Sequence, residues 1–289
     1  MVKNKPSVSI VVPVYNSEET VEDCLNSIIL QENDFLELIV VDNNSNDGTR
    51  KILKDYAGRY SKIKYILEEN KGRGSARNAG VKLAKGNIIV MTDADCIVSK
   101  NWIREIIKPI VEDGEKIVMG FQEDGVENYW TKQAQKMDLK FAKENAKEYI
   151  PHFDTKNVAV DASVMKKHLF DPRLKASEDL DFYLRVSPEQ KIRFLKEVRV
   201  THCHNLSFVE IVKVFFQRGF YSMKVIKKHI NDEETKGFLK SNSIFSNLNL
   251  FKLFFRFLYR LFTSPLTCWY LFVIGVSWQI GALFGRFKN

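Results

Sequence analysis

Two carboxylates one residue apart, Asp93 and Asp95, directly follow an apolar run of the chain. The run, Ile88–Met91, is rich in β-branched residues and predicts a buried strand that ends at this acidic pair. Carboxylate oxygens are the ligands that hard divalent cations prefer, and such cations bind diphosphates. The pattern therefore predicts chemistry on a substrate that carries a diphosphate. The same short pattern is common in solvated turns. The surrounding sequence therefore has to show whether the acidic pair belongs to a functional site.

Short apolar runs alternate with helical patterns through the first hundred residues. Amphipathic segments begin near Ser17, Asp47 and Ser75, each between two of the runs. This alternation predicts an open, Rossmann-like, doubly wound α/β sheet that is mostly parallel. The predicted strands are Val8–Val12, Leu36–Val41, Ile63–Leu67, Ile88–Met91, Ile117–Phe121, Ile192–Leu195 and Val198–Val200, and a further helix is predicted over Trp102–Val111, ending near Pro109.

Polar groups follow the first four predicted strands. In doubly wound sheets, ligands bind at the carboxyl ends of the strands. Each group taken singly is compatible with an ordinary turn, but four of them on one edge predict a single binding site. The groups are Pro13–Asn16, Asp42–Ser45, Asn70–Gly74 and Asp93–Asp95.

In their order and spacing, these motifs resemble the inverting family 2 glycosyltransferases, which have the GT-A fold. The resemblance covers about residues 7–220 and implies a nucleotide-sugar donor, with a UDP-sugar expected, and a Mg²⁺ or Mn²⁺ ion. The family's processive Gln-x-x-Arg-Trp motif is absent, so we expect transfer of a single sugar. Asn43 stands where the family often has a second Asp. The resemblance rests on Pro13–Asn16, Val40–Thr49, Asn70–Gly80, Asp93–Asp95 and Glu178–Asp179.

The resemblance also implies roles for individual residues. The donor nucleotide is expected against Pro13, Tyr15, Asn16, Asp42, Arg77 and Asp93, and the metal is expected on Asp95 with Asp93. His202 is a candidate third metal ligand, because some enzymes of this fold supply a histidine after the acceptor region. A structural role for His202 is an equally open interpretation.

Physical arguments support several of these assignments. A carboxylate at Asp42 can accept the imide N–H of uracil, which cytosine lacks. A cation at Arg77 and a metal ion at Asp95 can balance the negative charge of the donor and its leaving group.

Glu178 and Asp179 are adjacent, so at a helix start they point about 100° apart and cannot both serve the same proton. Asp179 is the expected catalytic base, and Glu178 is expected to orient the acceptor or a loop. Alternatively, both carboxylates only stabilise a helix N-terminus.

The net charge of +8 is confined to one part of the chain. Residues 206–289 hold 12 Lys and Arg against 4 Asp and Glu, so residues 1–205 are neutral. A basic region rich in aromatic residues is typical of a membrane surface with anionic lipid, and we expect no nucleic-acid partner. The sequence therefore predicts a GT-A catalytic domain over 1–205 and a helical, membrane-associated region over 206–289.

Two segments of that tail favour membrane association. Residues 248–262 carry a basic stripe on an apolar helix and predict a helix in the plane of the interface. Residues 266–285 contain no charge and just reach the length of a membrane span, although a re-entrant segment or a buried core hairpin has the same pattern. Four isolated cysteines and the lack of a signal sequence favour the cytoplasmic face of the cell membrane, with peripheral or single-pass attachment and a glycan or lipid-linked acceptor.

Other classes of protein fit the sequence less well. A dinucleotide-dependent oxidoreductase needs Gly-x-Gly-x-x-Gly after the first strand, and Pro13–Asn16 stands there instead. A nucleotidyltransferase would have a glycine-rich phosphate loop near the N-terminus. A non-catalytic scaffold that binds a nucleotide-sugar at the membrane is the main alternative, and Asp93, Asp95 and Asp179 argue against it.

Overall fold

The computed structural model describes residues 6–125, 128–144, 148–203, 207–233, 235–237 and 265–287. The chain forms two compact units. Unit 1 comprises residues 1–127 and 135–204, and unit 2 comprises residues 128–134 and 205–289. The predicted interfacial helix over 248–262 lies outside the described residues.

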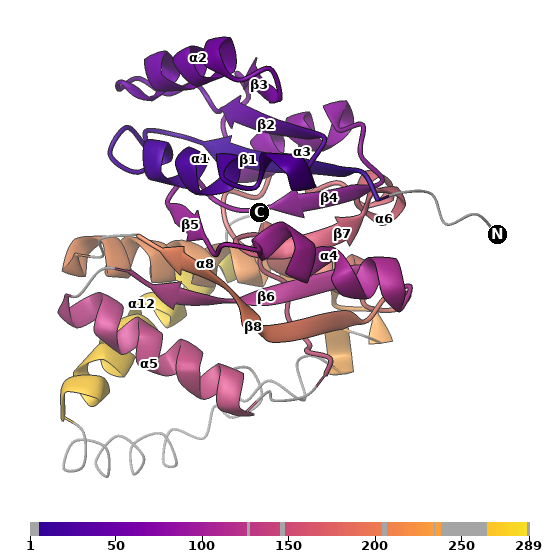
Figure 1. The fold of residues 1–289 in the computed structure, drawn as a ribbon. Helices are drawn as coiled ribbons and strands as arrows, with labels where there is room; N and C mark the ends of the chain where they lie inside the picture. Colours follow the sequence, from indigo (N-terminus) through magenta and orange to yellow (C-terminus); the bar gives the residue numbers. More distant parts are fainter. Residues whose placement is uncertain are drawn as a thin grey trace. The chain divides into compact units, whose positions relative to one another are not determined.

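Unit 1 is built on one eight-stranded sheet with the strand order β3-β2-β1-β4-β7-β6-β8-β5 (Figure 1). All neighbouring pairs from β3 to β4 are parallel, and β6 is parallel to β8. Strand β7 runs antiparallel between β4 and β6, so these two strands point the same way. The strands are β1 (Val8–Val14), β2 (Glu37–Asp42), β3 (Ile63–Leu67), β4 (Ile88–Met91), β5 (Cys96–Val98), β6 (Ile117–Asp124), β7 (Val158–Asp161) and β8 (Ile192–His202).

Helices cover both faces of the sheet, which confirms the predicted doubly wound architecture. One apolar core joins the sheet to α1, α2 and α4, and a second joins the opposite face to α3, α6 and α7. Strands β1, β2 and β4 are almost wholly buried because both faces are covered. The helices are α1 (Val21–Ile29), α2 (Thr49–Arg59), α3 (Arg73–Leu83), α4 (Trp102–Glu112), α6 (Ala162–Lys167) and α7 (Glu178–Val186), with a short 3₁₀ turn at Glu32–Asp34.

Several predicted boundaries were wrong, among them the end of β6, which continues from Phe121 to Asp124. The runs Ile192–Leu195 and Val198–Val200 belong to one strand, β8, whose pairing with β6 shifts between Gly120 and Phe121. Helix α4 continues through Pro109 to Glu112, because the helix is held by its buried face as well as by its backbone hydrogen bonds.

Asn157 stabilises the shifted region between β6 and β8. Its amide donates to the backbone oxygens of Phe121 and Val198 at 2.8 and 2.9 Å, and its oxygen accepts from the indole of Trp102 at 2.8 Å. A Cβ atom on Gly120 would lie 2.2 Å from the Asn157 amide nitrogen and 2.4 Å from the Val198 oxygen. Position 120 therefore has no room for a side chain.

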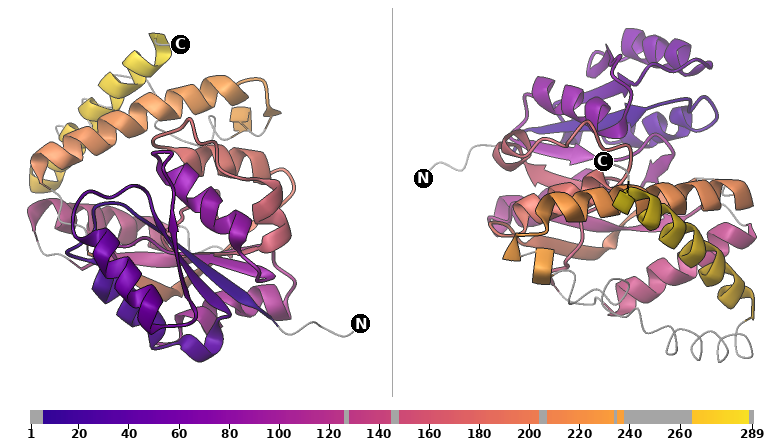
Figure 2. Two further views of the ribbon diagram at one scale, coloured as in Figure 1. Left: turned by 90° about the horizontal axis from the view of Figure 1, so that it is seen from above. Right: turned by 180° about the vertical axis from the view of Figure 1, so that it is seen from behind.

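Unit 2 contains the start of α5 (Tyr129–Glu144), α8 (Phe208–His229) and α12 (Pro265–Phe287). Helices α8 and α12 lie against each other, seen in orange and yellow in Figure 2. A Cβ on Gly219 would lie 2.0 Å from the Trp278 oxygen, and one on Gly281 would lie 1.9 Å from the Phe216 oxygen. Glycines on both helices thus permit direct backbone contact, as in helix pairs of membrane proteins.

Gly120→Ala is expected to lower the free energy of unfolding by about 2–3 kcal/mol, because the new methyl group must displace backbone or Asn157. Gly58→Ala is the control, since nothing lies within 4 Å of its Cβ position in α2. That change should be neutral or stabilising by up to about 1 kcal/mol. Urea denaturation followed by circular dichroism measures both, and equal midpoints for the two variants would contradict the packing described at Gly120.

Candidate functional site

The carboxyl ends of β1, β2, β4, β6 and β8 meet at one edge of the sheet of unit 1, and β7 begins there. This geometry follows from the strand directions alone. It brings the polar groups predicted from the sequence to the same edge. Three non-glycine residues near this edge, Asn16, Asn44 and Ser177, have φ between 47° and 64°. Such backbone conformations are costly and are concentrated at functional sites.

Arg77 is the central residue of this edge. Its side chain is 2% exposed, and its guanidinium donates to Asp93 Oδ1 at 2.9 Å and to Glu178 Oε1 at 2.7 Å. Burial lowers the pKa of Arg77, but the two carboxylates outweigh this effect and raise it. Arg77 therefore joins α3, the end of β4 and the start of α7 by charge-assisted hydrogen bonds.

The two glycines before Arg77 allow α3 to start close to its neighbours. Gly72 has φ of +142°, a region that glycine adopts readily. A Cβ on Gly74 would lie 3.3 Å from Phe170 and 3.4 Å from the Asp171 oxygen. The Phe170 ring lies 5.8 Å from the Arg77 guanidinium carbon. The Gly72–Arg77 segment thus packs directly on the chain that leads into α7.

Glu178 and Asp179 form the first turn of α7, as predicted, but their surroundings differ. Glu178 is buried and paired with Arg77, whereas Asp179 is partly exposed and accepts from the Leu180 amide at 2.8 Å. Ser177, immediately before them, has a left-handed backbone conformation. The two adjacent carboxylates therefore have different surroundings.

Asp42 ends β2 at the predicted edge, and its carboxylate is fully buried. Oδ1 accepts from the Ser45 amide at 2.8 Å, and Oδ2 accepts from Arg50 Nε at 2.9 Å and from the Tyr65 hydroxyl at 3.1 Å. Burial raises the pKa of Asp42, and the hydrogen bonds lower it further than burial raises it. These contacts fix the loop after β2, and a nucleobase N–H could reach this carboxylate only if one of these donors moved.

Asn43 is also engaged in holding loops together. Its amide donates to the backbone oxygens of Glu68 and Asn70 at 3.0 and 2.8 Å, and its oxygen accepts from the Gly72 amide at 2.8 Å. Asn43 thus connects the loop after β2 with the loop before α3. From the sequence, Asn43 was noted only as a residue that differs from the family pattern, and its bridging role was not predicted.

The loop after β1 presents the predicted nucleotide-binding residues. Pro13 lies in β1, Tyr15 is 51% exposed, and Asn16 is held by its neighbours. The Asn16 amide donates to Ser45 Oγ at 3.1 Å, and its side-chain oxygen accepts from the Asn46 amide at 3.0 Å. An exposed aromatic ring on an ordered loop is suited to stack on a nucleobase.

Asp95 and His202 meet at the same edge, although 107 positions separate them. His202 Nε2 lies 3.2 Å from Asp95 Oδ2, and its Nδ1 lies 3.8 Å from Asp124 Oδ1. Burial lowers the pKa of His202, but Asp124 and Asp95 outweigh it and raise the pKa to about 9. The contact depends on the register that pairs Cys96 and Asp124 with His202.

These side chains fit a divalent cation. Ligand atoms of Asp95, Cys96 and His202 all lie within 4.8 Å of one another. Cys96 offers a soft sulfur ligand, which Mg²⁺ and Mn²⁺ do not prefer. Asp124 Oδ2 is buried without a hydrogen-bond partner among the described residues. The carboxylate oxygens of Asp95 and Asp124 are ligands that suit Mg²⁺ or Mn²⁺.

Sequence reasoning missed Arg50, Asp124 and Lys156. Asp124 follows a predicted strand, so extending that run to its end would have found it. Arg50 and Lys156 had no such signal, because their importance depends on partners that only the fold brings near.

A comparison with protein families identifies the chain. The model of Glycosyl transferase family 2 matches residues 9–169. The chain belongs to glycosyl transferase family 2. Two relatives agree with this assignment. The glycosyltransferase AglE of Haloferax volcanii is 29% identical over 179 residues, 58% of this chain and 59% of AglE. The uncharacterized glycosyltransferase MJ1057 of Methanocaldococcus jannaschii is 30% identical over 251 residues, 78% of this chain and 82% of that protein.

The fold is also that of solved glycosyltransferases. The mannosyltransferase PcManGT from Pyrobaculum calidifontis, solved with GDP-Man and Mn²⁺, superposes with a TM-score of 0.71 at 17% identity, over 97% of this chain and 88% of that one. The predicted GT-A fold is thereby confirmed. The chain spans 59% of the length of AglE, so similarity to that relative is limited to part of it.

Arg77→Met is expected to lower the free energy of unfolding by about 3–5 kcal/mol, because Asp93 and Glu178 lose the cation that compensates their burial. Arg173→Met is the control, since its ion pair with Asp171 leaves the Arg173 side chain 80% exposed. That change should leave stability nearly unchanged. Thermal and urea unfolding measure both variants, and a fully stable Arg77→Met protein would show that the pairing is dispensable.

Proposed function

We propose that the protein is a metal-dependent inverting glycosyltransferase that moves one sugar from a nucleotide-sugar to a hydroxyl or phosphate acceptor. The observation that carries the proposal is the Arg77 bridge, which ties the Asp93 end of β4 to Glu178 at the start of α7. Residues expected to face the donor diphosphate and the acceptor are thereby held in one place. Relatives named as glycosyltransferases support the reaction class.

The donor is expected to lie over the loops that follow β1, β2 and β4. Tyr15 is available to stack on the base, and Pro13, Asn16 and Asp93 border the same edge. The prediction of a UDP-sugar depends on a hydrogen bond from uracil to Asp42. The oxygens of Asp42 already accept three hydrogen bonds within the protein. PcManGT was solved with GDP-Man, so guanosine donors belong in the same test as uridine donors.

A divalent cation is proposed at Asp95 and His202, with Asp93 nearby. When bound, it would neutralise charge on the leaving diphosphate. The donor set of carboxylates and an imidazole supports Mg²⁺ or Mn²⁺, and PcManGT contains Mn²⁺.

Asp179 is proposed as the catalytic base. The acceptor oxygen attacks C1 of the sugar, its proton moves to the Asp179 carboxylate, and the bond from C1 to the diphosphate breaks with its electron pair on the leaving nucleoside diphosphate. One displacement inverts the anomeric carbon. The different surroundings of Asp179 and Glu178 support this division of roles, because Glu178 is buried and paired with Arg77, whereas Asp179 is partly exposed.

Asp179→Asn is expected to lower turnover by about 100-fold or more and to leave donor binding intact, because only the base is lost. Glu189→Gln, an exposed carboxylate paired with Lys167, is the matched control and should retain full turnover. Binding is measured by thermal shift with UDP-sugars and GDP-sugars in Mn²⁺, since a ligand of the native state raises the melting temperature. Turnover is measured as the release of nucleoside diphosphate while the sugar is transferred to a panel of acceptors or to water.

Two results would contradict the proposal. Wild-type protein that binds a donor but never releases nucleoside diphosphate would favour the non-catalytic scaffold. Full turnover in Asp179→Asn would reject Asp179 as the base.

Unit 2 is proposed to hold the protein at a membrane surface, peripherally or by one span, with the catalytic unit on the cytoplasmic face. Among the described residues, α12 is long and apolar enough to cross a membrane, with a mean hydropathy of 1.5 and 28% of its most apolar window buried. One face of α12 packs on α8, while large apolar side chains on the other face are exposed. These are Leu266, Trp269, Phe272, Val276, Ile280, Leu283, Phe284 and Phe287.

The basic excess of residues 206–289 supports the same location, because anionic lipid attracts Lys and Arg near a membrane. A membrane location in turn favours a lipid-linked acceptor, since donor and acceptor would meet at the surface.

Replacing both Phe272 and Ile280 by Glu is expected to reduce binding to vesicles of anionic phosphatidylglycerol at least tenfold, because carboxylates would enter the lipid-facing side of α12. Leu83→Glu is the control, since Leu83 is a similarly exposed apolar residue of unit 1. Vesicle flotation measures binding, and a carbonate wash separates peripheral from spanning protein. Full-length wild-type protein that stays unbound would contradict the membrane proposal.

A further inference from the structure

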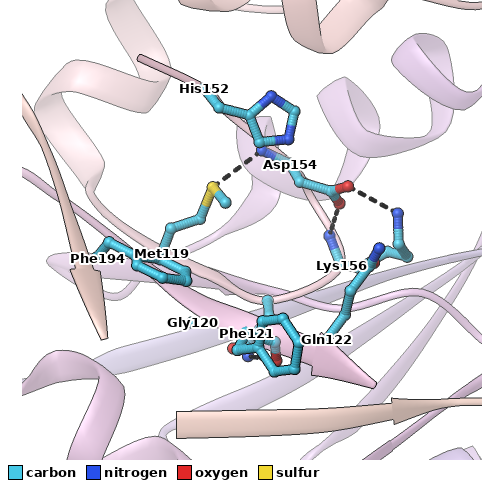
Figure 3. Close-up of a pocket in the computed structure, with 9 residues that line it drawn as sticks. Met119, Gly120, Phe121, Gln122, His152, Asp154, Lys156 and Phe194 are labelled. Atoms are coloured by element: carbon cyan, nitrogen blue, oxygen red, sulfur yellow. Dashed lines mark hydrogen bonds and ion pairs between the residues drawn. The ribbon is translucent and has the colours of Figure 1, made fainter. Parts of the chain in front are cut away.

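A small cavity opens in unit 1 between β6, the segment that leads into β7, and β8 (Figure 3). Its walls are of two kinds. Met119, Phe121 and Phe194 are apolar, whereas the opposite side carries charged and polar groups. The polar lining residues are Gln122, His152, Asp154, Lys156 and Asn157.

The cavity lies at the catalytic edge of the sheet. Val158, at the start of β7, pairs with Met91 in β4 and Met119 in β6. Lys156 precedes Val158 by two residues, and Asp93 follows Met91 by two residues, so both lie past the same end of the antiparallel pair.

Asp154 holds Lys156 in place. Its carboxylate accepts from Lys156 Nζ at 2.7 Å and from the Lys156 amide at 2.8 Å, and its own amide contacts Met119 Sδ at 3.1 Å. Figure 3 shows the Asp154 carboxylate directed toward Lys156. Burial raises the pKa of Asp154, but Lys156 and His152 lower it much further. The Lys156 side chain is 13% exposed, so a lysine that usually extends into water is here ordered and mostly buried.

The size of the cavity restricts what it can hold. It offers about 50 Å³ to the centres of water molecules, whereas one buried water needs roughly 10–15 Å³. A few waters or one tetrahedral anion fit this space, but a hexose does not. The cavity therefore has room for a small group and not for a second sugar.

The segment that carries His152, Asp154 and Lys156 also packs on the helix of the proposed base. Phe153, between His152 and Asp154, packs on Phe182 of α7 with ring centroids 4.4 Å apart. Asp179 lies three residues before Phe182, on the same side of the helix. The segment that lines the cavity and the helix of the proposed base are therefore held together by this ring contact.

We propose that this cavity binds a phosphate group of the acceptor, with Lys156 as its cation and His152 and Gln122 as polar partners. The inference rests on the proposed function and deepens it by naming the class of acceptor. The phosphate serves as an anchor, distinct from the hydroxyl that Asp179 deprotonates. The apolar wall of Met119, Phe121 and Phe194 lies beside it, which suits a phosphate that carries an alkyl chain. Asp154 is also a carboxylate in this cavity, and its pairing with Lys156 limits its repulsion of an anion.

A purely structural ion pair between Asp154 and Lys156 is the competing explanation, and anion binding distinguishes the two. The full-length protein is titrated with hexyl phosphate, inorganic phosphate and hexanol in EDTA, so that no metal ion recruits phosphate to the donor site. Isothermal titration calorimetry measures the affinities. We expect hexyl phosphate to bind more tightly than inorganic phosphate, and we expect hexanol not to bind. If inorganic phosphate binds more tightly than hexyl phosphate, the site is one for free phosphate and the acceptor assignment is overturned.

Lys156→Gln is expected to weaken hexyl phosphate binding at least tenfold, and Lys156→Arg to keep it within about threefold of wild type. Lys175→Gln, an exposed lysine of the loop before α7, is the control and should bind as wild type does. The double variant Asp154→Asn with Lys156→Gln also loses binding but buries no unpaired carboxylate, so it tests the site if Lys156→Gln fails to fold.

Nucleoside diphosphate binding in Mn²⁺ is measured on the same proteins and should not change in Lys156→Gln. If wild type and the double variant bind hexyl phosphate equally, or if wild type does not bind it, the acceptor subsite is overturned. Such a result leaves the proposed function standing. Wild-type protein that does not bind nucleoside diphosphate in Mn²⁺ would instead contradict the proposed function.

Discussion

The site depends on one buried cation held between two carboxylates. Arg77 pairs with Asp93, 16 positions away, and with Glu178, 101 positions away. Burying a guanidinium is costly unless opposite charge compensates it, so the end of β4 and the start of α7 have to be in place together. The acidic turn after β4 and the first turn of α7 are therefore one structural unit, although the chain between them forms β5, β6 and β7.

The sheet positions the other residues of the site. Parallel strands bring their ends to one edge, and the pairing of β5, β6 and β8 places Asp95, Asp124 and His202 together. Asn157 stabilises the shift between β6 and β8 with three hydrogen bonds, and Gly120 leaves room for it. The cavity of Lys156 lies next to this shift. An irregularity in strand pairing thus accompanies the proposed acceptor subsite.

Much of the fold was predictable because hydrophobic periodicity is a local signal. Strands β3 and β4 have the predicted bounds, β1 extends two residues beyond its prediction, and β2 is shifted by one residue. The positions of Asp93, Glu178 and Asp179 followed from motif spacing. Their pairings did not, because the Arg77–Glu178 contact joins segments whose approach is set by the whole sheet. Asp42 illustrates the same limit: its place at the end of β2 was predictable, but its burial against Arg50 and Tyr65 was not.

The central claim is that Arg77 holds the donor site and the catalytic base around one reacting sugar. A crystal structure of the full-length protein with Mn²⁺ and a non-hydrolysable nucleotide-sugar tests it most directly. We expect Mn²⁺ within about 2.5 Å of an Asp95 oxygen, the Arg77 pairs intact, and C1 of the sugar between the diphosphate and the Asp179 carboxylate. A nucleotide-sugar bound elsewhere, or an Asp179 carboxylate facing away from C1, would contradict the account.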